Sequence, residues 1–189
     1  MKKPIIFFIG KPGSGKGTQA ELLSKVTGWP VVGTSGGLRE IVATGSSVGH
    51  KLTEVMNAGL LTPYWVASYV YLKTLFGIPE DGNVIYDGTS RTLPEAEIVV
   101  ESLKWIDRPF HIFYLHVPDE EVHKRIALRS QSAARADDNA VAKRLEAYYE
   151  STAAAIELYR KTGMLTEIDG HRPPETIAEE VKSILKLES

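Results

Sequence analysis

The chain has 189 residues, of which 43% are hydrophobic and 24% are charged, and its formal net charge at pH 7 is -2. This length suits one domain with a substantial core, and the nearly balanced charge excludes a general nucleic-acid binder or a basic membrane-surface protein. No cysteine is present, which excludes disulfides and cysteine-ligated zinc. Because the net charge is slightly negative, any anionic ligand must be held by a local cluster of positive charge.

The first apolar run, Ile5–Ile9, follows two lysines, as in the start of a signal peptide. It is shorter than the core of a signal peptide, about 7–15 residues, or a membrane-spanning helix of about 20. We therefore expect a buried first strand in a soluble, cytoplasmic protein without a membrane partner.

Short apolar runs alternate with segments of helical periodicity along the chain. Strands are predicted over Ile5–Ile9, Trp29–Val32, Asn83–Asp87, His111–Val117 and Leu165–Asp169. Helices are predicted over Lys16–Val26, Leu38–Thr44, Ser47–Asn57, Tyr64–Phe76, Pro94–Trp105, Asp119–Ser130, Val141–Thr162 and Pro174–Leu187. Most apolar runs lack strict alternation, as strands covered on both faces do. The order predicts one α/β domain over residues 1–189, with a central parallel sheet of about five strands flanked by helices.

A glycine-rich stretch, "GKPGSGK", lies between the first strand and the first helix. Glycines allow backbone N–H groups to converge on an anion, and the following helix adds its positive end. Gly10, Gly15 and Lys16 fit the spacing of a phosphate-binding loop. The next position usually carries a Ser or Thr that meets Mg²⁺, whereas here it is Gly17, followed by Thr18. The stretch predicts a site for a nucleotide phosphate.

The ending "GKGTQ" of this loop resembles the adenylate kinases and their close relatives among nucleoside monophosphate kinases. Further segments resemble that family in the same order: "GTSGGLREIVATGS", "NAGLLTP", "VIYDGTSRTLPEAE", "HVPDEEVHKRI", "RADDNAVAKRL" and "GMLTEIDG". The resemblance implies a P-loop kinase fold, with a helical arm for the acceptor nucleotide at about residues 34–63 and a short lid at Ser130–Ala140.

The resemblance also implies an activity, which is Mg²⁺-dependent transfer of the γ-phosphoryl group of ATP to AMP by a monomer. The acceptor phosphate is already an anion, so the protein needs no general base. It must align two polyanions, offset their repulsion and exclude water, and planar guanidinium groups suit this task.

Site residues are carried over by position. The implied ATP-binding residues are Gly13, Ser14, Gly15, Lys16, Gly17, Thr18, Arg125 (against the base) and Gly170. The implied acceptor-binding residues are Thr34, Arg39, Leu61, Gly88, Arg91 and Glu95, with Arg39 and Arg91 on the α-phosphate. The implied catalytic residues are Lys16, Arg91, Arg129, Arg135 and Arg144, with Asp137 and Asp138 orienting the lid arginines. Taken singly, any of these arginines is equally typical of a solvated helix face, and the two aspartates of a polar loop.

Asp87 ends an apolar strand, where a bare carboxylate is costly without a partner. A water-bonded Mg²⁺ is one partner, and this position resembles the magnesium-associated aspartate of the family. The alternative is a turn, because Asp-Gly is a common turn pair.

Departures from the family gather at the acceptor pocket. Ser35 and Gly36 replace a glycine and an aspartate, and Thr89 and Ser90 replace an aromatic residue and a proline. The proline is often preceded by a cis peptide in relatives. Ser90 is expected to be trans with a shifted local path, because a cis bond before a non-proline residue costs about 2.5–4 kcal/mol.

Glu95 stands where adenylate kinases carry a glutamine that reads the AMP base. An ionised carboxylate only accepts hydrogen bonds, which suits the two adjacent donors of guanine better than adenine. Glu95 therefore favours GMP, while the rest of the pattern favours AMP. The alternative is a helix N-terminal acid that does not contact the base.

Two other functions remain open at this point. One is a kinase for another acceptor, GMP, CMP or UMP, and the other is a non-catalytic nucleotide-binding protein. Because Lys16, Asp87 and the lid arginines occur together, the sequence favours a kinase.

Overall fold

The computed structural model describes residues 4–132 and 141–187. Its strands are β1 (Ile5–Gly10), β2 (Val31–Gly33), β3 (Ile85–Asp87), β4 (Phe110–His116) and β5 (Leu165–Asp169). All pair in parallel, in the order β2-β3-β1-β4-β5, so the predicted five-stranded parallel sheet is confirmed.

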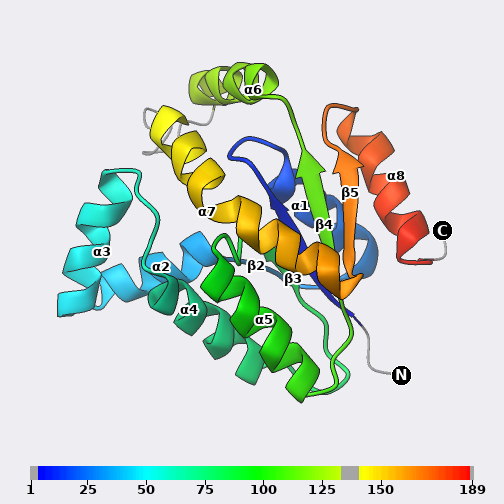
Figure 1. The fold of residues 1–189 in the computed structure, drawn as a ribbon, viewed down its shortest axis with the longest axis horizontal. Coiled ribbons are helices and arrows are strands. Elements are labelled where there is room, and N and C mark those ends of the chain that lie inside the picture. Colours follow the sequence, from blue (N-terminus) through cyan, green and yellow to red (C-terminus); the bar gives the residue numbers. More distant parts are fainter. Residues whose placement is uncertain (1–3, 133–140, 188–189) are drawn as a thin grey trace.

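Helices flank both faces of this sheet (Figure 1). They are α1 (Lys16–Thr27), α2 (Thr34–Ala43), α3 (Ser47–Asn57), α4 (Tyr64–Phe76), α5 (Leu93–Trp105), α6 (Asp119–Ser132), α7 (Val141–Thr162) and α8 (Pro174–Ile184). The fold is therefore the α/β arrangement of a P-loop kinase. Among the described residues, no helix is both long and apolar enough to cross a membrane.

Strand β1 lies at the centre of the sheet and contributes to the core on both faces. Ile5, Phe7 and Ile9 pack in one apolar cluster with residues of α4, α5 and α7. Ile6 and Phe8 point to the other face, where they pack with residues of α1 and α8. This burial on both faces explains why the run Ile5–Ile9 is continuously apolar.

Helices α2, α3 and α4 have a small apolar cluster of their own. Leu38, Leu52, Val66 and Val70 are buried together, apart from the two clusters on the sheet. In Figure 1, α2 and α3 project to the left of the sheet. A compact extension with its own small core suits the helical arm expected at residues 34–63.

Helix α2 begins at Thr34, four residues before the predicted start at Leu38. The prediction was wrong because two consecutive glycines, Gly36 and Gly37, are poor helix formers. Packing explains the second glycine, since a Cβ atom on Gly37 would lie 2.4 Å from Cγ1 of Val70 in α4. A Cβ atom on Gly36 would meet no heavy atom within 4 Å. Gly37 therefore lets α2 approach α4 closely.

We predict that Gly37→Ala destabilises the protein relative to Gly36→Ala by about 1–3 kcal/mol, the usual cost of overpacking a closely packed contact. Both changes replace a glycine in the same helix, so the gain in helix propensity cancels in the comparison. The measurement is urea unfolding followed by circular dichroism. Equal midpoints for the two variants would contradict close packing at Gly37.

Candidate active site

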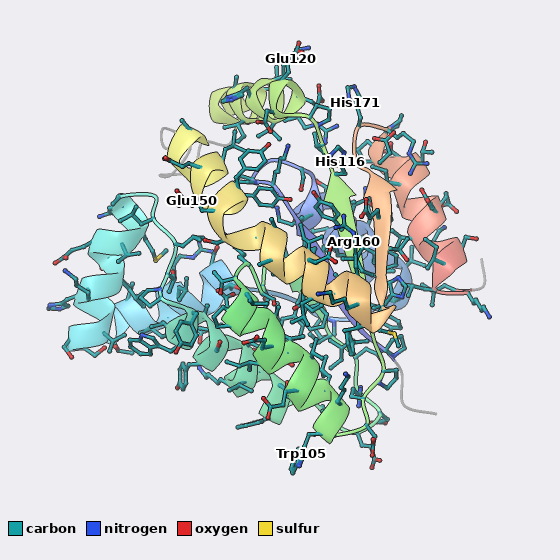
Figure 2. The ribbon with its side chains drawn as sticks, in the orientation of Figure 1. Trp105, His116, Glu120, Glu150, Arg160 and His171 are labelled. Carbon is teal, nitrogen blue, oxygen red and sulfur yellow. The ribbon has the colours of Figure 1, made fainter. Side chains whose placement is uncertain are left out.

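The carboxyl ends of all the parallel strands meet at one edge of the sheet, where open α/β sheets bind ligands. The glycine-rich loop leaves β1 at this edge, and the segment from Asp87 to Arg91 leaves the neighbouring β3. Figure 2 labels His116, which ends β4, and His171, just beyond β5, at the same edge. Trp105, at the far end of α5, lies away from it.

The glycine-rich loop has the backbone of an anion nest. Gly10, Gly13 and Gly15 all have positive φ, and Gly15 caps α1 in the left-handed conformation with φ of 96°. The Nζ atom of Lys16 folds back and donates to the backbone oxygens of Gly10 at 2.9 Å and Lys11 at 2.6 Å. Its ammonium group therefore lies against the loop, next to the N-terminus of α1, where a phosphate would be bound.

Asp87 lies directly over the first turn of α1. A Cβ atom on Gly17 would lie 3.2 Å from Oδ2 of Asp87, closer than most real Cβ contacts. A Ser or Thr side chain in this place would crowd the carboxylate. The glycine that departs from the general phosphate-loop motif is therefore explained by the close approach of Asp87.

Arg91 follows Asp87 by one short turn. Its Nε donates to the carbonyl oxygen of Gly88 at 2.8 Å, so the side chain curls back toward the end of β3. The Oγ1 atoms of Thr34 and Thr89 lie 3.0 Å apart and share a hydrogen bond between α2 and this turn. Phosphate loop, Asp87, Arg91 and Thr34 are thus brought to adjacent strand ends.

No cis peptide bond occurs among the described residues, which confirms the expected trans peptide at Ser90. The local path is indeed unusual, because Ser90 has φ of 65° and is completely buried.

Glu95 lies in the first turn of α5 and is only 6% exposed. Its Oε2 accepts from the backbone N–H of Arg91 at 3.0 Å, and its Oε1 accepts from the hydroxyl of Thr92 at 2.8 Å. Burial raises the pKa of Glu95, and these hydrogen bonds and the charge of Arg91 oppose that rise. Both carboxylate oxygens thus accept hydrogen bonds from the chain at the helix start.

Arg125 and Gly170 lie on the β4 and β5 side of the phosphate loop. The Nε of Arg125 donates to Glu121 at 2.7 Å, and one terminal nitrogen lies 3.4 Å from the carbonyl oxygen of Ser14. The N–H of Gly170 donates to the carbonyl oxygen of His116 at 2.9 Å, and a Cβ atom on Gly170 would lie 2.6 Å from Val117. Arg125 therefore lies beside the phosphate loop, whereas Gly170 lies against the end of β4.

A buried lysine in the loop was not predicted as a functional residue. Nζ of Lys11 lies 2.6 Å from Oδ1 of Asp119, and the hydroxyl of Tyr149 donates to the same oxygen at 2.6 Å. These contacts lower the pKa of Asp119; burial alone would lower the pKa of Lys11, but the hydrogen bonds with Asp119 and Tyr149 raise it. The three side chains join the phosphate loop to the start of α6 and to the third turn of α7. In the sequence, only the acidic start of α6 hinted at such a contact.

For several other predicted site residues, the structure gives only the helix or the degree of exposure. Arg39 is exposed on α2, and Leu61 is half-buried between α3 and α4. Arg129 lies in α6 and Arg144 in α7. Helix α6 continues to Ser132, so the predicted lid begins as helix, and Arg135, Asp137 and Asp138 lie outside the described residues.

The family model described as "Adenylate kinase" matches residues 8–164. An adenylate kinase from Synechococcus sp. is 35% identical over 97% of this chain and 96% of its own length. One from Thermus thermophilus is 33% identical over 96% of this chain and 97% of its own. Human adenylate kinase isoenzyme 1 is 31% identical over 95% of this chain and 93% of its own. Because the match spans nearly the whole chain and includes the phosphate loop, this protein belongs to the adenylate kinase family and is a nucleoside monophosphate kinase.

Proposed function

We propose that the protein is an adenylate kinase, which transfers the γ-phosphoryl group of ATP to AMP reversibly and forms two ADP. The observation that carries this proposal is the juxtaposition at the end of β1 and β3. The phosphate loop with Lys16 leaves one strand, and the turn with Arg91 leaves its immediate neighbour. Two phosphate-binding elements on adjacent strands suit the alignment of a donor and an acceptor.

The chain's own residues divide between the two nucleotides. We assign the ATP phosphates to Gly13, Ser14, Gly15, Lys16, Gly17 and Thr18, and the region of its base to Arg125 and Gly170. We assign the acceptor to Thr34, Arg39, Leu61, Gly88 and Arg91. Glu95 follows the Arg91 turn, in the first turn of α5. Positive charge from Lys16, Arg91, Arg129, Arg135 and Arg144 would offset the negative charge of the transferred group. No general base is needed, because the attacking phosphate oxygen is already an anion.

Magnesium fits the acidic side chain at this site. Among residues 4–132 and 141–187, no group of three or more His, Asp and Glu side chains could hold a metal ion alone. Mg²⁺ usually keeps several waters and is held by one or two carboxylates together with substrate phosphates. Asp87, which lies over Gly17 beside the phosphate loop, would hold such an ion through water. When bound, the ion would offset charge on the ATP phosphates.

AMP is the proposed acceptor, as the names of the relatives suggest. The alternative acceptor GMP depends on Glu95 accepting from the guanine base. Both oxygens of this carboxylate already accept hydrogen bonds from Arg91 and Thr92, and the side chain is buried. This arrangement favours AMP over the alternative.

We propose that one chain is the complete catalytic unit, since the phosphate loop and the Arg91 turn leave neighbouring strands of one sheet. It would act as a single monomeric domain over residues 1–189, with an acceptor arm at 34–63 and a short lid at 130–140. We also propose a cytoplasmic location, with which a chain that has no cysteine and so forms no disulfide is compatible.

The proposal is tested by initial rates of ADP formation from Mg·ATP with AMP, GMP, CMP or UMP, and without an acceptor. We expect AMP to be the fastest acceptor and the reaction without acceptor to be negligible. A preference for GMP would overturn the choice of acceptor but leave the kinase activity. No transfer to any acceptor, despite tight ATP binding, would indicate a non-catalytic nucleotide-binding protein.

Lys16→Met is predicted to lower kcat by at least about 100-fold, because it removes a positive charge placed against the phosphate loop. The measurement is the rate of ADP formation at saturating Mg·ATP and AMP, with thermal unfolding as the control for folding. Turnover close to that of the unaltered protein would refute the proposed role of Lys16.

Gly17→Ala is predicted to reduce turnover about tenfold, because the new methyl group displaces the Asp87 carboxylate by a few tenths of an ångström. Stability should not fall, since alanine is the better helix former. Gly77→Ala is the matched control, because a Cβ atom there makes an ordinary contact at 3.5 Å. Rates are measured over a range of Mg²⁺ concentrations. Equal rates and equal Mg²⁺ dependence for both variants would contradict the proposed role of Asp87 in holding Mg²⁺.

A further inference from the structure

The turn that carries Arg91 is strained at a buried position. Ser90 has φ of 65°, a left-handed conformation that residues other than glycine adopt only at a cost. The side chain of Ser90 is completely buried, and its neighbour Thr89 is 5% exposed. Such a conformation persists only when the surrounding contacts fix it, so the contacts of this turn are informative.

One of these contacts comes from a distant helix. The Oγ of Ser90 shares a hydrogen bond with the hydroxyl of Tyr159, which lies 69 residues further along the chain. Tyr159 is on α7 and is 0% exposed, and its ring belongs to the main apolar cluster on the sheet. The turn is therefore attached to the core by a hydroxyl pair from which water is excluded.

The second contact is the Glu95 carboxylate. It accepts hydrogen bonds from the N–H of Arg91 and the hydroxyl of Thr92, and the N–H of Ser90 also interacts with it. One buried carboxylate thus gathers donors from three consecutive residues. An acid in this first turn of α5 is also favoured by the helix dipole.

Arg91 lies between these two attachments. Its backbone N–H is held by Glu95, and its Nε donates to the carbonyl oxygen of Gly88 on the other side of Ser90. The direction of the guanidinium group thus depends on a backbone path that Glu95 and Tyr159 hold in place. A nucleotide base that engaged both oxygens of Glu95 would have to compete with the N–H and hydroxyl donors that hold this path.

We propose that Glu95 and Tyr159 are positioning residues, which fix the turn from Gly88 to Thr92 so that Arg91 meets the acceptor phosphate, and that Glu95 does not read the acceptor base. The inference rests on the proposed function for the existence of an acceptor site. It replaces the base-reading role with a positioning role for the same side chain.

The test compares Tyr159→Phe, Ser90→Ala and Glu95→Gln with Tyr148→Phe as the matched control. Tyr148 is also a buried tyrosine of α7, and its hydroxyl bonds to that of Tyr114 at 2.9 Å, away from the Arg91 turn. The measurements are KM for AMP, GMP and ATP, kcat, and the affinity for AMP by calorimetry. Thermal unfolding reports whether each variant is folded.

We expect Tyr159→Phe and Ser90→Ala to lower kcat/KM for AMP about three- to tenfold, the effect of one lost hydrogen bond. KM for ATP should stay constant, and the double variant should lose no more than either single variant. Glu95→Gln should lower kcat/KM for AMP and GMP by the same factor, about tenfold or more, and leave their ratio unchanged. Tyr148→Phe should leave the acceptor kinetics unchanged.

The decisive comparison repeats these changes in an Arg91→Ala background. If Glu95 and Tyr159 act through Arg91, neither change weakens AMP binding further there. A shift of the AMP-to-GMP ratio toward AMP in Glu95→Gln would overturn the proposal, because it would show that Glu95 reads the base. Additive losses in the Arg91→Ala background would also overturn it, and so would equal effects of Tyr159→Phe and Tyr148→Phe.

If Glu95→Gln does not fold, the comparison of Tyr159→Phe with Tyr148→Phe still tests the proposal. Absence of transfer in the unaltered protein would refute the proposed function instead, while calorimetry of AMP binding would still test the positioning role.

Discussion

Repulsion between two phosphate groups is the constraint that the site must meet, because donor and acceptor nucleotides both carry negative charge into one place. The chain has a net charge of -2, so attraction by the whole protein cannot supply the compensation. We propose that local groups supply it, namely the backbone N–H groups of the glycine-rich loop, the start of α1, Lys16 and the arginines. The parallel sheet matters because it delivers two of these groups, on β1 and β3, to the same edge.

Close approach explains why small residues lie where they do. Gly17 allows the Asp87 carboxylate to lie over the first turn of α1, and Gly37 allows α2 to lie against α4. Larger side chains at either place would move an element that carries a proposed phosphate or acceptor contact. The apolar clusters on both faces of β1 pack the sheet that carries this edge between helices.

Two networks of polar side chains complete this support. Lys11, Asp119 and Tyr149 join the phosphate loop to α6 and α7 on one side of β1. Glu95, Ser90 and Tyr159 hold the Arg91 turn on the other side. Helix α7 contributes a tyrosine to each network, so it is linked to both proposed phosphate-binding elements. The second network is buried, and buried polar groups stabilise a fold only when each has its hydrogen-bond partner.

Much of this arrangement could be predicted from the sequence, and the reason is local. The strands are short apolar runs, and the phosphate loop is defined by the spacing of Gly10, Gly15 and Lys16. The start of α2 could not be predicted, because the reason for Gly37 is Val70, a residue of another helix. The polar networks could not be predicted either, since Ser90 and Tyr159 are 69 residues apart and no periodicity in the sequence relates such a pair. Glu95 was open to two interpretations, because a carboxylate in the first turn of a helix can bind a nucleotide base or can stabilise the start of the helix. Only the contacts of Glu95 in the folded chain distinguish these roles.

We propose direct transfer between two nucleotides with water excluded. Phosphorus NMR of Mg·ATP and AMP incubated with the protein tests this proposal, since it distinguishes ADP from inorganic phosphate. We expect ATP and AMP to be converted to ADP, with two ADP formed for each ATP consumed and no accumulation of inorganic phosphate. Release of inorganic phosphate without loss of AMP would contradict it, because the site would then be passing the phosphoryl group to water.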